Sequence, residues 1–423
     1  MANELTFTQS ATILNSLLEQ AQGKASITAV NETQFVAQAQ IALKIGYEGI
    51  MNSLSQVLSR TIFSVRPYNR KFAGLYADRI RYGNHVRKIS PIDGEFEDDS
   101  RNTLSDGYSI DPWVVNKPKA LQMNWYGENV YQISRTFFKD QLDTAFSSSA
   151  EFGSFVSMVL QNISDMIEQK HEVTARATLA NLIAGKSVAD SGNVIHLITE
   201  YKTAKGIAGD FDYNDPDNFG DFARWLFGYI ETLSDALTER SIKYHMNVTN
   251  KAINRHTPKE DQILYLFAPL MNAIKTEVKS VTFNQELLDI IDYERVMYFQ
   301  SIETPDTIKV KPNYIDATGA IVNSEETITV ENILGVIFDR ECCGYTVVNE
   351  WSQSTPMNAR GGYTNTFWHF TDRPWCDLTE NAVVLLLDEA SSPSPDPDPD
   401  PDPDPDPDPD PDPDPSPDDT TNN

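Results

Sequence analysis

The most regular pattern of hydrophobic positions lies between residues 148 and 185. Its large apolar residues recur every three or four positions, which is the spacing of one face of an α-helix. Ser148 followed by Glu151 fits a capping box, and Gly185 is expected to end the helix. The pattern therefore predicts a helix on the order of 50 Å long, which would span a domain rather than fit inside a compact one. The repeating apolar residues are Phe152, Phe155, Val156, Val159, Leu160, Ile163, Met166 and Ile167.

Shorter helical patterns occur on both sides of this segment. Residues 7–23 form an amphipathic arm with Ile13, Leu14, Leu17 and Leu18 on one face. Residues 33–63 are also helix-like, although two glycines weaken the middle. A further amphipathic helix is predicted over residues 218–241, with its buried side formed by Phe222, Trp225, Leu226, Tyr229, Ile230 and Leu233.

Alternating patterns of strand type fill most of the remaining chain. From Arg66 to about Ser134, turn residues separate short runs in which apolar and polar positions alternate, so a long β-hairpin is expected. Residues 242–335 mix strand-like pieces (244–250, 261–267 and 293–302) with a helical piece at 268–278, which indicates a separate α/β domain. Residues 331–388 are predicted to be mainly strand.

Charge changes this picture at the end of the chain. Pro and Asp alternate from Pro395 to Asp414, a pattern that removes backbone donors and adds self-repelling charge, so an extended spacer without a fold of its own is expected. It could serve as a polyanionic brush or only as a solubilising tail. The formal net charge is -28, and 12 aspartates in residues 391–423 leave -16 for residues 1–390. Such an acidic chain is not expected to read DNA sequence, which requires a basic face.

Charge is also sorted along the predicted hairpin. Its first part is basic and its second part is acidic. The pattern fits either solvated charge or a complementary contact between subunits, and we predict that the basic residues meet acidic patches on adjacent subunits. The basic set is Arg66, Arg70, Lys71, Arg79, Arg81, Arg87 and Lys88, and the acidic set is Asp93, Glu95, Glu97, Asp98, Asp99, Asp106 and Asp111.

Candidate chemistry is sparse. The stretch HEVTA at His171 begins like a zinc-protease helix, but Ala175 stands where a second histidine would be needed, so a solvated helical histidine is expected. Neither a phosphate-binding loop, a dinucleotide fingerprint nor a nucleophile elbow occurs in the sequence. No catalytic residue, cofactor site or metal site is therefore assigned, and the protein is not expected to be an enzyme.

One acidic loop partly matches a calcium-binding pattern. Asp210, Asp212, Asn214 and Asp221 occupy the first, third, fifth and twelfth positions, but the glycine required at the sixth position is replaced by Asp215. Whether these residues bind calcium stays open at this stage. A loop that caps the helix starting near Asn218 accounts for them better.

Three cysteines and the absence of an apolar spanning segment indicate the compartment. Cys342 and Cys343 are adjacent, which makes a disulfide between them awkward, and they are expected to be small core residues. Together with Cys376 they favour a reducing compartment. The sequence shows no export signal, and its longest apolar run is too short to cross a membrane.

The order of elements resembles the major capsid protein of tailed bacteriophages, with the Hong Kong 97-type fold and small podovirus-type local sequence. Residues 257–278 look like an axial-domain segment of that family. The closing stretch looks like its end, where an Asn-x-Arg-Gly turn at Asn358 to Gly361 precedes an aromatic strand and a final strand starting at Asn381. In some members a hairpin lysine forms a covalent cross-link to the next subunit. Lys117 and Lys119 lie in the corresponding region without identifying such a bond.

The resemblance implies an α+β fold in six parts. These are an N-terminal arm (1–65), an extended β-hairpin loop (66–135), a peripheral domain with a long spine helix (136–215), an axial domain (216–335), returning peripheral strands (336–390) and a disordered acidic Pro-Asp tail (391–423).

The function that the resemblance implies is a structural major capsid protein. It would self-assemble into hexamers and pentamers of an icosahedral or prolate head around double-stranded DNA, in the cytoplasm of a bacterial host. A separate scaffolding protein and a portal are the expected partners, with non-specific DNA contact and no membrane. The alternatives are a bacterial surface adhesin on a Pro-Asp stalk, which would need an export signal, and a hydrolase with an unrecognised carboxylate pair.

Overall fold

The computed structural model describes a mixed helix and sheet fold. The described residues are 10–12, 14–15, 34–39, 71–77, 85–92, 105–107, 109, 113, 115, 117, 119–188, 192–248, 253–281, 293–316 and 318–389. The helices are η1 (Ala73–Leu75), α4 (Lys139–Ala145), α5 (Ser149–Val188), α6 (Leu197–Lys205), α7 (Pro216–Thr238), η3 (Lys259–Asp261) and α8 (Ala268–Val281). The strands are β1 (Val86–Pro91), β2 (Ala120–Trp125), β3 (Asn129–Phe138), β4 (Val194–His196), β5 (Gln262–Phe267), β6 (Glu294–Val296), β7 (Ile308–Val310), β8 (Asn313–Ile315), β9 (Ile321–Asn323), β10 (Ile328–Val330), β11 (Ile333–Asp339), β12 (Cys343–Ser354), β13 (Tyr363–Cys376) and β14 (Ala382–Leu386).

A five-stranded sheet carries the largest part of the core. Its strand order is β4-β14-β11-β5-β6, with antiparallel pairing around β11 and parallel pairing of β4 and β6 at the two edges. Every residue of β11 and β14 is buried. These strands are apolar on both faces because α7 and α8 cover one face and the second half of α5 covers the other.

The predicted long helix is α5, which begins where the sequence indicates and ends later. The Glu151 amide donates to Ser148 Oγ over 3.2 Å, so the expected cap is present. The helix has 40 residues, or about 60 Å. The expected end at Gly185 is wrong, because the helix continues to Val188. A Cβ at position 185 would lie 2.5 Å from the Asn313 carbonyl oxygen, so this glycine permits a close approach to β8 instead.

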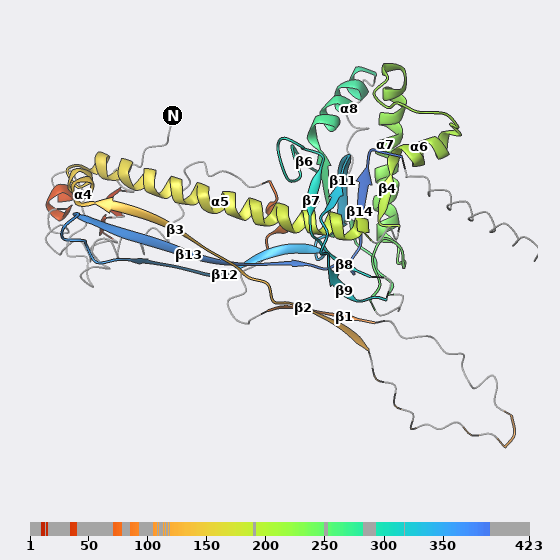
Figure 1. Ribbon diagram of the computed structural model, residues 1–423, viewed down its shortest axis with the longest axis horizontal. Coiled ribbons are helices and arrows are strands. Elements are labelled where there is room, and N and C mark those ends of the chain that lie inside the picture. The colour runs from red at the N-terminus through yellow and green to blue at the C-terminus, as the bar shows by residue number, and fades with distance from the viewer. Residues whose placement is uncertain are drawn as a thin grey trace, which may run out of the picture. The chain divides into compact units, whose positions relative to one another are not determined.

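A three-stranded antiparallel sheet, β12-β13-β3, runs alongside α5 (Figure 1). β12 and β13 form a long hairpin whose turn contains the predicted Asn-x-Arg-Gly stretch. Asn358 Oδ1 accepts hydrogen bonds from the amides of Arg360 and Gly361, each over 3.0 Å. Such an Asx turn explains why this residue order occurs between two strands.

The described part of the predicted hairpin loop contains η1, β1, β2 and most of β3. β1 pairs with β2 in antiparallel register, from Val86 opposite Trp125 to Pro91 opposite Ala120, whereas β3 pairs with β13 in the three-stranded sheet. The Ile92 amide continues the ladder by donating to the Lys119 carbonyl over 3.0 Å. Four of the basic residues, Arg66, Arg70, Arg79 and Arg81, lie outside the described residues. So do most of the acidic set, nearly all of the predicted arm at 1–65, and the tail at 391–423.

Two details of the predicted α/β segment differ in the structure. Residues 244–248, expected to begin a strand, belong to no strand because their backbone bonds to remote loops, as in the Met246 amide donating to the Leu378 carbonyl. β11 crosses the expected boundary at 335/336 and pairs with β5. The division into six parts stays a prediction.

Candidate functional site: the hairpin anchor

The base of the β1-β2 hairpin is fixed to the body of the chain by a cluster that we call the hairpin anchor, made of Lys88, Trp125, Glu341, Asp377 and Glu380. Lys88 Nζ lies 2.7 Å from Glu380 Oε1, 3.1 Å from Glu341 Oε2 and 3.2 Å from Asp377 Oδ2. On the neighbouring strand, Trp125 Nε1 donates to the Cys376 carbonyl over 2.9 Å. Both strands of the hairpin are therefore held by side chains.

The acidic side of the anchor is a rigid turn between β13 and β14. Asp377 Oδ1 accepts from the Thr379 amide and hydroxyl over 2.9 and 2.6 Å. Beneath the turn, the fully buried Lys186 of α5 donates to the carbonyls of Leu378 and Glu380 over 2.9 and 3.0 Å. The turn therefore offers its carboxylates to Lys88 from a fixed position.

Burial and charge oppose each other in the anchor. Burial by itself lowers the pKa of Lys88, but the carboxylates of Asp377 and Glu380 raise that pKa above its ordinary value overall. Burial raises the pKa of Glu380, and Lys88 and Arg255 partly offset that rise. Lys186 differs because burial lowers its pKa. The carboxylates of the turn therefore favour the charged form of Lys88.

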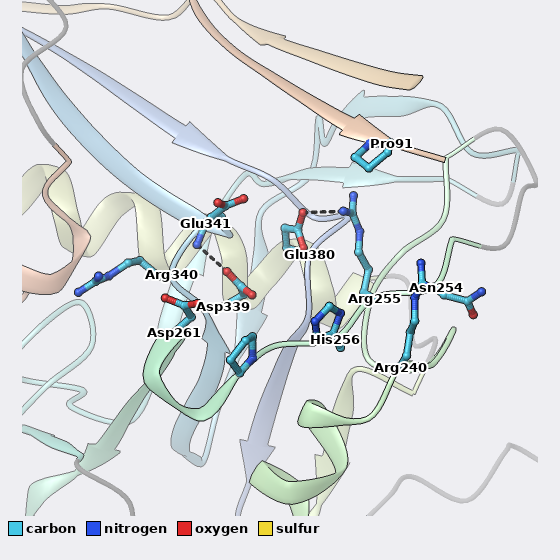
Figure 2. A pocket seen from close by; sticks show the side chains of 11 residues that line it. Pro91, Arg240, Asn254, Arg255, His256, Asp261, Asp339, Arg340, Glu341 and Glu380 are labelled. Carbon is cyan, nitrogen blue, oxygen red and sulfur yellow. Dashed lines mark hydrogen bonds and ion pairs between the residues drawn. The ribbon is translucent and has the colours of Figure 1, made fainter. Parts of the chain in front are cut away.

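A cavity of about 370 Å³ lies beside the anchor (Figure 2). Arg255 Nη1 contacts Glu380 Oε1 over 3.1 Å, and the Glu341 amide donates to Asp339 Oδ1 over 2.8 Å. The lining mixes basic and acidic side chains, so it offers no single charge to a ligand. The residues that line it are Pro91, Arg240, Asn254, Arg255, His256, Pro258, Asp261, Asp339, Arg340, Glu341 and Glu380.

A buried polar network explains the local sequence at Thr257 and Asn381. Thr257 Oγ1 donates to Asp339 Oδ2 over 2.8 Å and accepts from Asn381 Nδ2 over 3.2 Å. Gln262 Nε2 donates to the carbonyls of Ser234 and Thr257, each over 3.0 Å. These residues join α7, β5, β11 and β14, so their part is to position strands, not to carry out a reaction.

The charge prediction for the hairpin is wrong for Lys88. Its acidic partners belong to its own chain rather than to another subunit, since Glu380 follows it by 292 residues. Arg87, the residue before Lys88 in β1, points to the other face and is exposed. No local pattern in the sequence pairs Lys88 with the acids of the last turn, because Glu380 lies 292 positions away.

The acidic loop before α7 acts as a helix cap. Asp215 is the N-cap residue, and its side chain accepts from the Asp217 amide over 3.0 Å. Asp221 lies within α7 and pairs with Arg224 over 2.8 Å. Asp212 Oδ1 accepts from the Asn214 amide over 2.8 Å. Across the described part of the chain, no group of three or more His, Cys, Asp or Glu side chains could hold a metal ion.

The expectation for His171 is also wrong. It is 5% exposed and not solvated, with Nε2 3.7 Å from Asp372 Oδ1 and its ring 5.5 Å from that of Tyr345. The reason is that β12 and β13 cover this part of α5. Tyr131 donates to the other oxygen of Asp372 over 2.9 Å.

The cysteines lie where the sequence predicts. Cys342 and Cys343 are free and buried in the core below the five-stranded sheet. Burial raises the pKa of both thiols, which keeps them protonated. None of the helices among the described residues has the length and apolar character needed to cross a bilayer.

Comparison with known proteins identifies a family that matches most of the chain. A model described as the Phi29-like phage major capsid protein matches residues 11–386. A chain in the structure of head fiber and inner core protein gp22 of native bacteriophage P68 is 12% identical, with a TM-score of 0.51, over 78% of this chain and 87% of that chain. The capsid structures of Staphylococcus phage Andhra and Cyanophage P-SCSP1u are 10% and 12% identical. Their TM-scores are 0.48 and 0.44, over 77% and 78% of this chain and 86% and 91% of those chains. No curated protein is similar enough to match.

Proposed function

Because the chain belongs to the Phi29-like phage major capsid protein family and so is a structural component of a phage capsid, we propose that its copies assemble into hexamers and pentamers. These rings would build an icosahedral or prolate head that encloses double-stranded DNA. The observation that carries the proposal is the family match over residues 11–386. The surface-adhesin alternative receives no support from any comparison.

The long helix supports this proposal physically. A subunit that forms a thin shell must keep its shape while neighbours press on its edges. α5 spans about 60 Å and contacts both sheets of the body, so bending it would disturb two packed layers at once. α5 therefore stiffens the subunit along its length.

The hairpin anchor supports it in a second way. An arm that contacts a neighbour is useful only if its direction is set before the contact forms, because ordering it later costs free energy of association. Lys88 and Trp125 fix the direction of β1 and β2 at their base. Several such contacts from each subunit, each modest, would close a shell by avidity.

The finer architecture follows the Hong Kong 97-type plan in this proposal. The six parts would be the arm at 1–65, the hairpin loop at 66–135, the peripheral domain at 136–215, the axial domain at 216–335, the returning strands at 336–390 and the Pro-Asp tail at 391–423. In this division α7, β5, α8 and β6 to β10 belong to the axial part, α5 belongs to the peripheral part, and β12, β13 and β14 belong to the returning strands.

The partners follow from the assembly route. A separate scaffolding protein and a portal would act with this chain in the host bacterial cytoplasm, after which it would remain in the virion. Its contact with packaged DNA would be non-specific, because the net charge of -28 disfavours close binding of another polyanion. We propose no enzymatic activity.

Expression of the chain alone, and then together with the genes that neighbour it, tests this function. Light scattering and negative-stain electron microscopy would detect shells or rings of uniform size, which the proposal expects in the second condition at least. The matched control expresses the neighbouring genes without this chain. A stable monomer in both conditions contradicts the proposal, as do shells that form without the chain.

A further inference from the structure

The three-stranded sheet has one face that no described element covers. Cross-strand pairs identify the side chains on it: Thr136 Oγ1 donates to Asn365 Oδ1 over 2.7 Å, and the Trp351 and His369 rings stack with centroids 3.9 Å apart. The opposite face lies against α5, where Ile133, Phe137 and Trp368 are buried. On the uncovered face, Val130, Phe138 and Trp351 are 71%, 47% and 46% exposed.

This uncovered face is free of formal charge. Its outward positions are the alternate residues of β3 from Val130 to Phe138, of β12 from Asn349 to Gln353 and of β13 from Tyr363 to Thr371. None of them is Asp, Glu, Lys or Arg, although these residue types make up 23% of the chain. Aromatic, amide and hydroxyl side chains take their place. We call this surface the neutral face.

We propose that the neutral face is buried against a second copy of this chain in the assembled shell, an inference that rests on the proposed function. Two copies that each carry a net charge of -28 repel one another, so they approach most easily where neither partner has to bury a charge. Aromatic side chains with exposed apolar neighbours and few charges are typical of the centre of a protein interface.

The size and chemistry of the neutral face agree with this occupant. Nine residues of β13 at about 3.3 Å each span about 30 Å, and three strands about 4.8 Å apart add a width of roughly 15 Å with their side chains. That area of about 450 Å² is roughly half of one side of a standard interface. DNA is a weaker candidate, because the face lacks the Lys and Arg side chains that neutralise phosphates.

Two double variants test the inference. Val130→Glu with Trp351→Glu places charge on the face, and Val130→Thr with Trp351→Phe keeps it neutral. Each is expressed with the neighbouring genes, and shells are separated from free subunits by sedimentation. We expect the charged variant to yield at least about tenfold fewer shells than the wild type, because a buried unpaired carboxylate is strongly unfavourable. The neutral variant should assemble like the wild type.

The outcomes separate this inference from the proposed function. If the wild type forms no shells, the proposed function itself fails. Should wild-type and charged chains form shells in equal yield, the proposed function stands and the neutral face is not an interface. Charged shells that form normally but hold less DNA would assign the face to DNA and overturn the inference.

A cross-linking measurement decides the case in which the charged variant does not fold. Benzoylphenylalanine replaces Trp351, a substitution that keeps an aromatic group, and assembled shells are irradiated. A covalent dimer of the chain is expected. If only monomer is found in irradiated shells, the second copy does not lie on this face, and the inference is wrong.

Discussion

Replacing Lys88 with methionine removes the cation of the hairpin anchor while keeping most of its length. Asp377 and Glu380 have side chains only 1% and 7% exposed, so they lose a charged partner that water cannot replace. Breaking one side of a buried ion pair costs about 3 to 5 kcal/mol. Asp377 keeps its bonds to Thr379, and Glu380 keeps Arg255. We therefore expect Lys88→Met to lower the free energy of unfolding by about 3 kcal/mol, the low end of that range.

The assay is urea unfolding of the unassembled chain, followed by circular dichroism. Lys117→Met is the matched control, because Lys117 is exposed in the same predicted hairpin, and its substitution should change the free energy of unfolding by less than about 0.5 kcal/mol. Adding Asp377→Asn to Lys88→Met should recover at least about 1 kcal/mol, since the two sites are coupled. A loss below 1 kcal/mol at Lys88, or strict additivity with Asp377, would refute the reasoning.

The same variant has a defined pH dependence. The carboxylates raise the pKa of Lys88. Its contribution to the stability of the folded state is therefore present below its ordinary pKa of 10.5 and is lost as the pH rises through the raised value. Burial raises the pKa of Glu380, so this carboxylate takes up its proton earlier than usual as the pH falls. The difference in stability between wild type and Lys88→Met should therefore shrink from pH 7 towards pH 4. A difference that grows instead would contradict this assignment.

Further substitutions test the helices and a turn. Gly185→Ala should destabilise the chain in thermal unfolding, because its Cβ would meet the Asn313 carbonyl, whereas Gly228→Ala, with open space around it, should stabilise α7 by up to about 1 kcal/mol. Equal effects would contradict the close approach. Asp215→Ala should cost about 1 kcal/mol in urea unfolding through loss of the α7 cap, and no change would dismiss that cap. Hydrogen bonds from the Thr318 hydroxyl and nearby amides lower the pKa of Asp316. The contribution of Asp316 to stability should therefore be present above pH 3.8 and fade as the pH falls through the lowered value. Titration by NMR should find that low pKa. An ordinary pKa for Asp316 would contradict the hydrogen bonds of this turn.

Local signals in the sequence predict where elements begin better than where they end. The cap at Ser148 depends on residues three positions apart, and the structure confirms it. The end of α5 depends on β8, a remote segment, and Gly185 therefore gives a misleading local signal. The predicted strand at 244–250 fails for the same reason. Its backbone bonds to residues near 378 and 382, which no periodic pattern reveals.

The hairpin anchor shows how far a single sequence can predict a site. The sequence shows the basic residues of the hairpin, but the partner of Lys88 lies 292 positions away, and only the fold brings the two together. His171 was expected in water because a helical pattern does not show what covers each face. The buried cysteines were predictable, since they lie between two strongly apolar strands.

The most direct test of the central claim is cryo-electron microscopy of shells formed with the neighbouring genes, at a resolution that reveals α5 as a rod. The account predicts closed heads in which five copies of α5 surround some positions and six surround the others. Open sheets, or rings with a different number of copies, would contradict it.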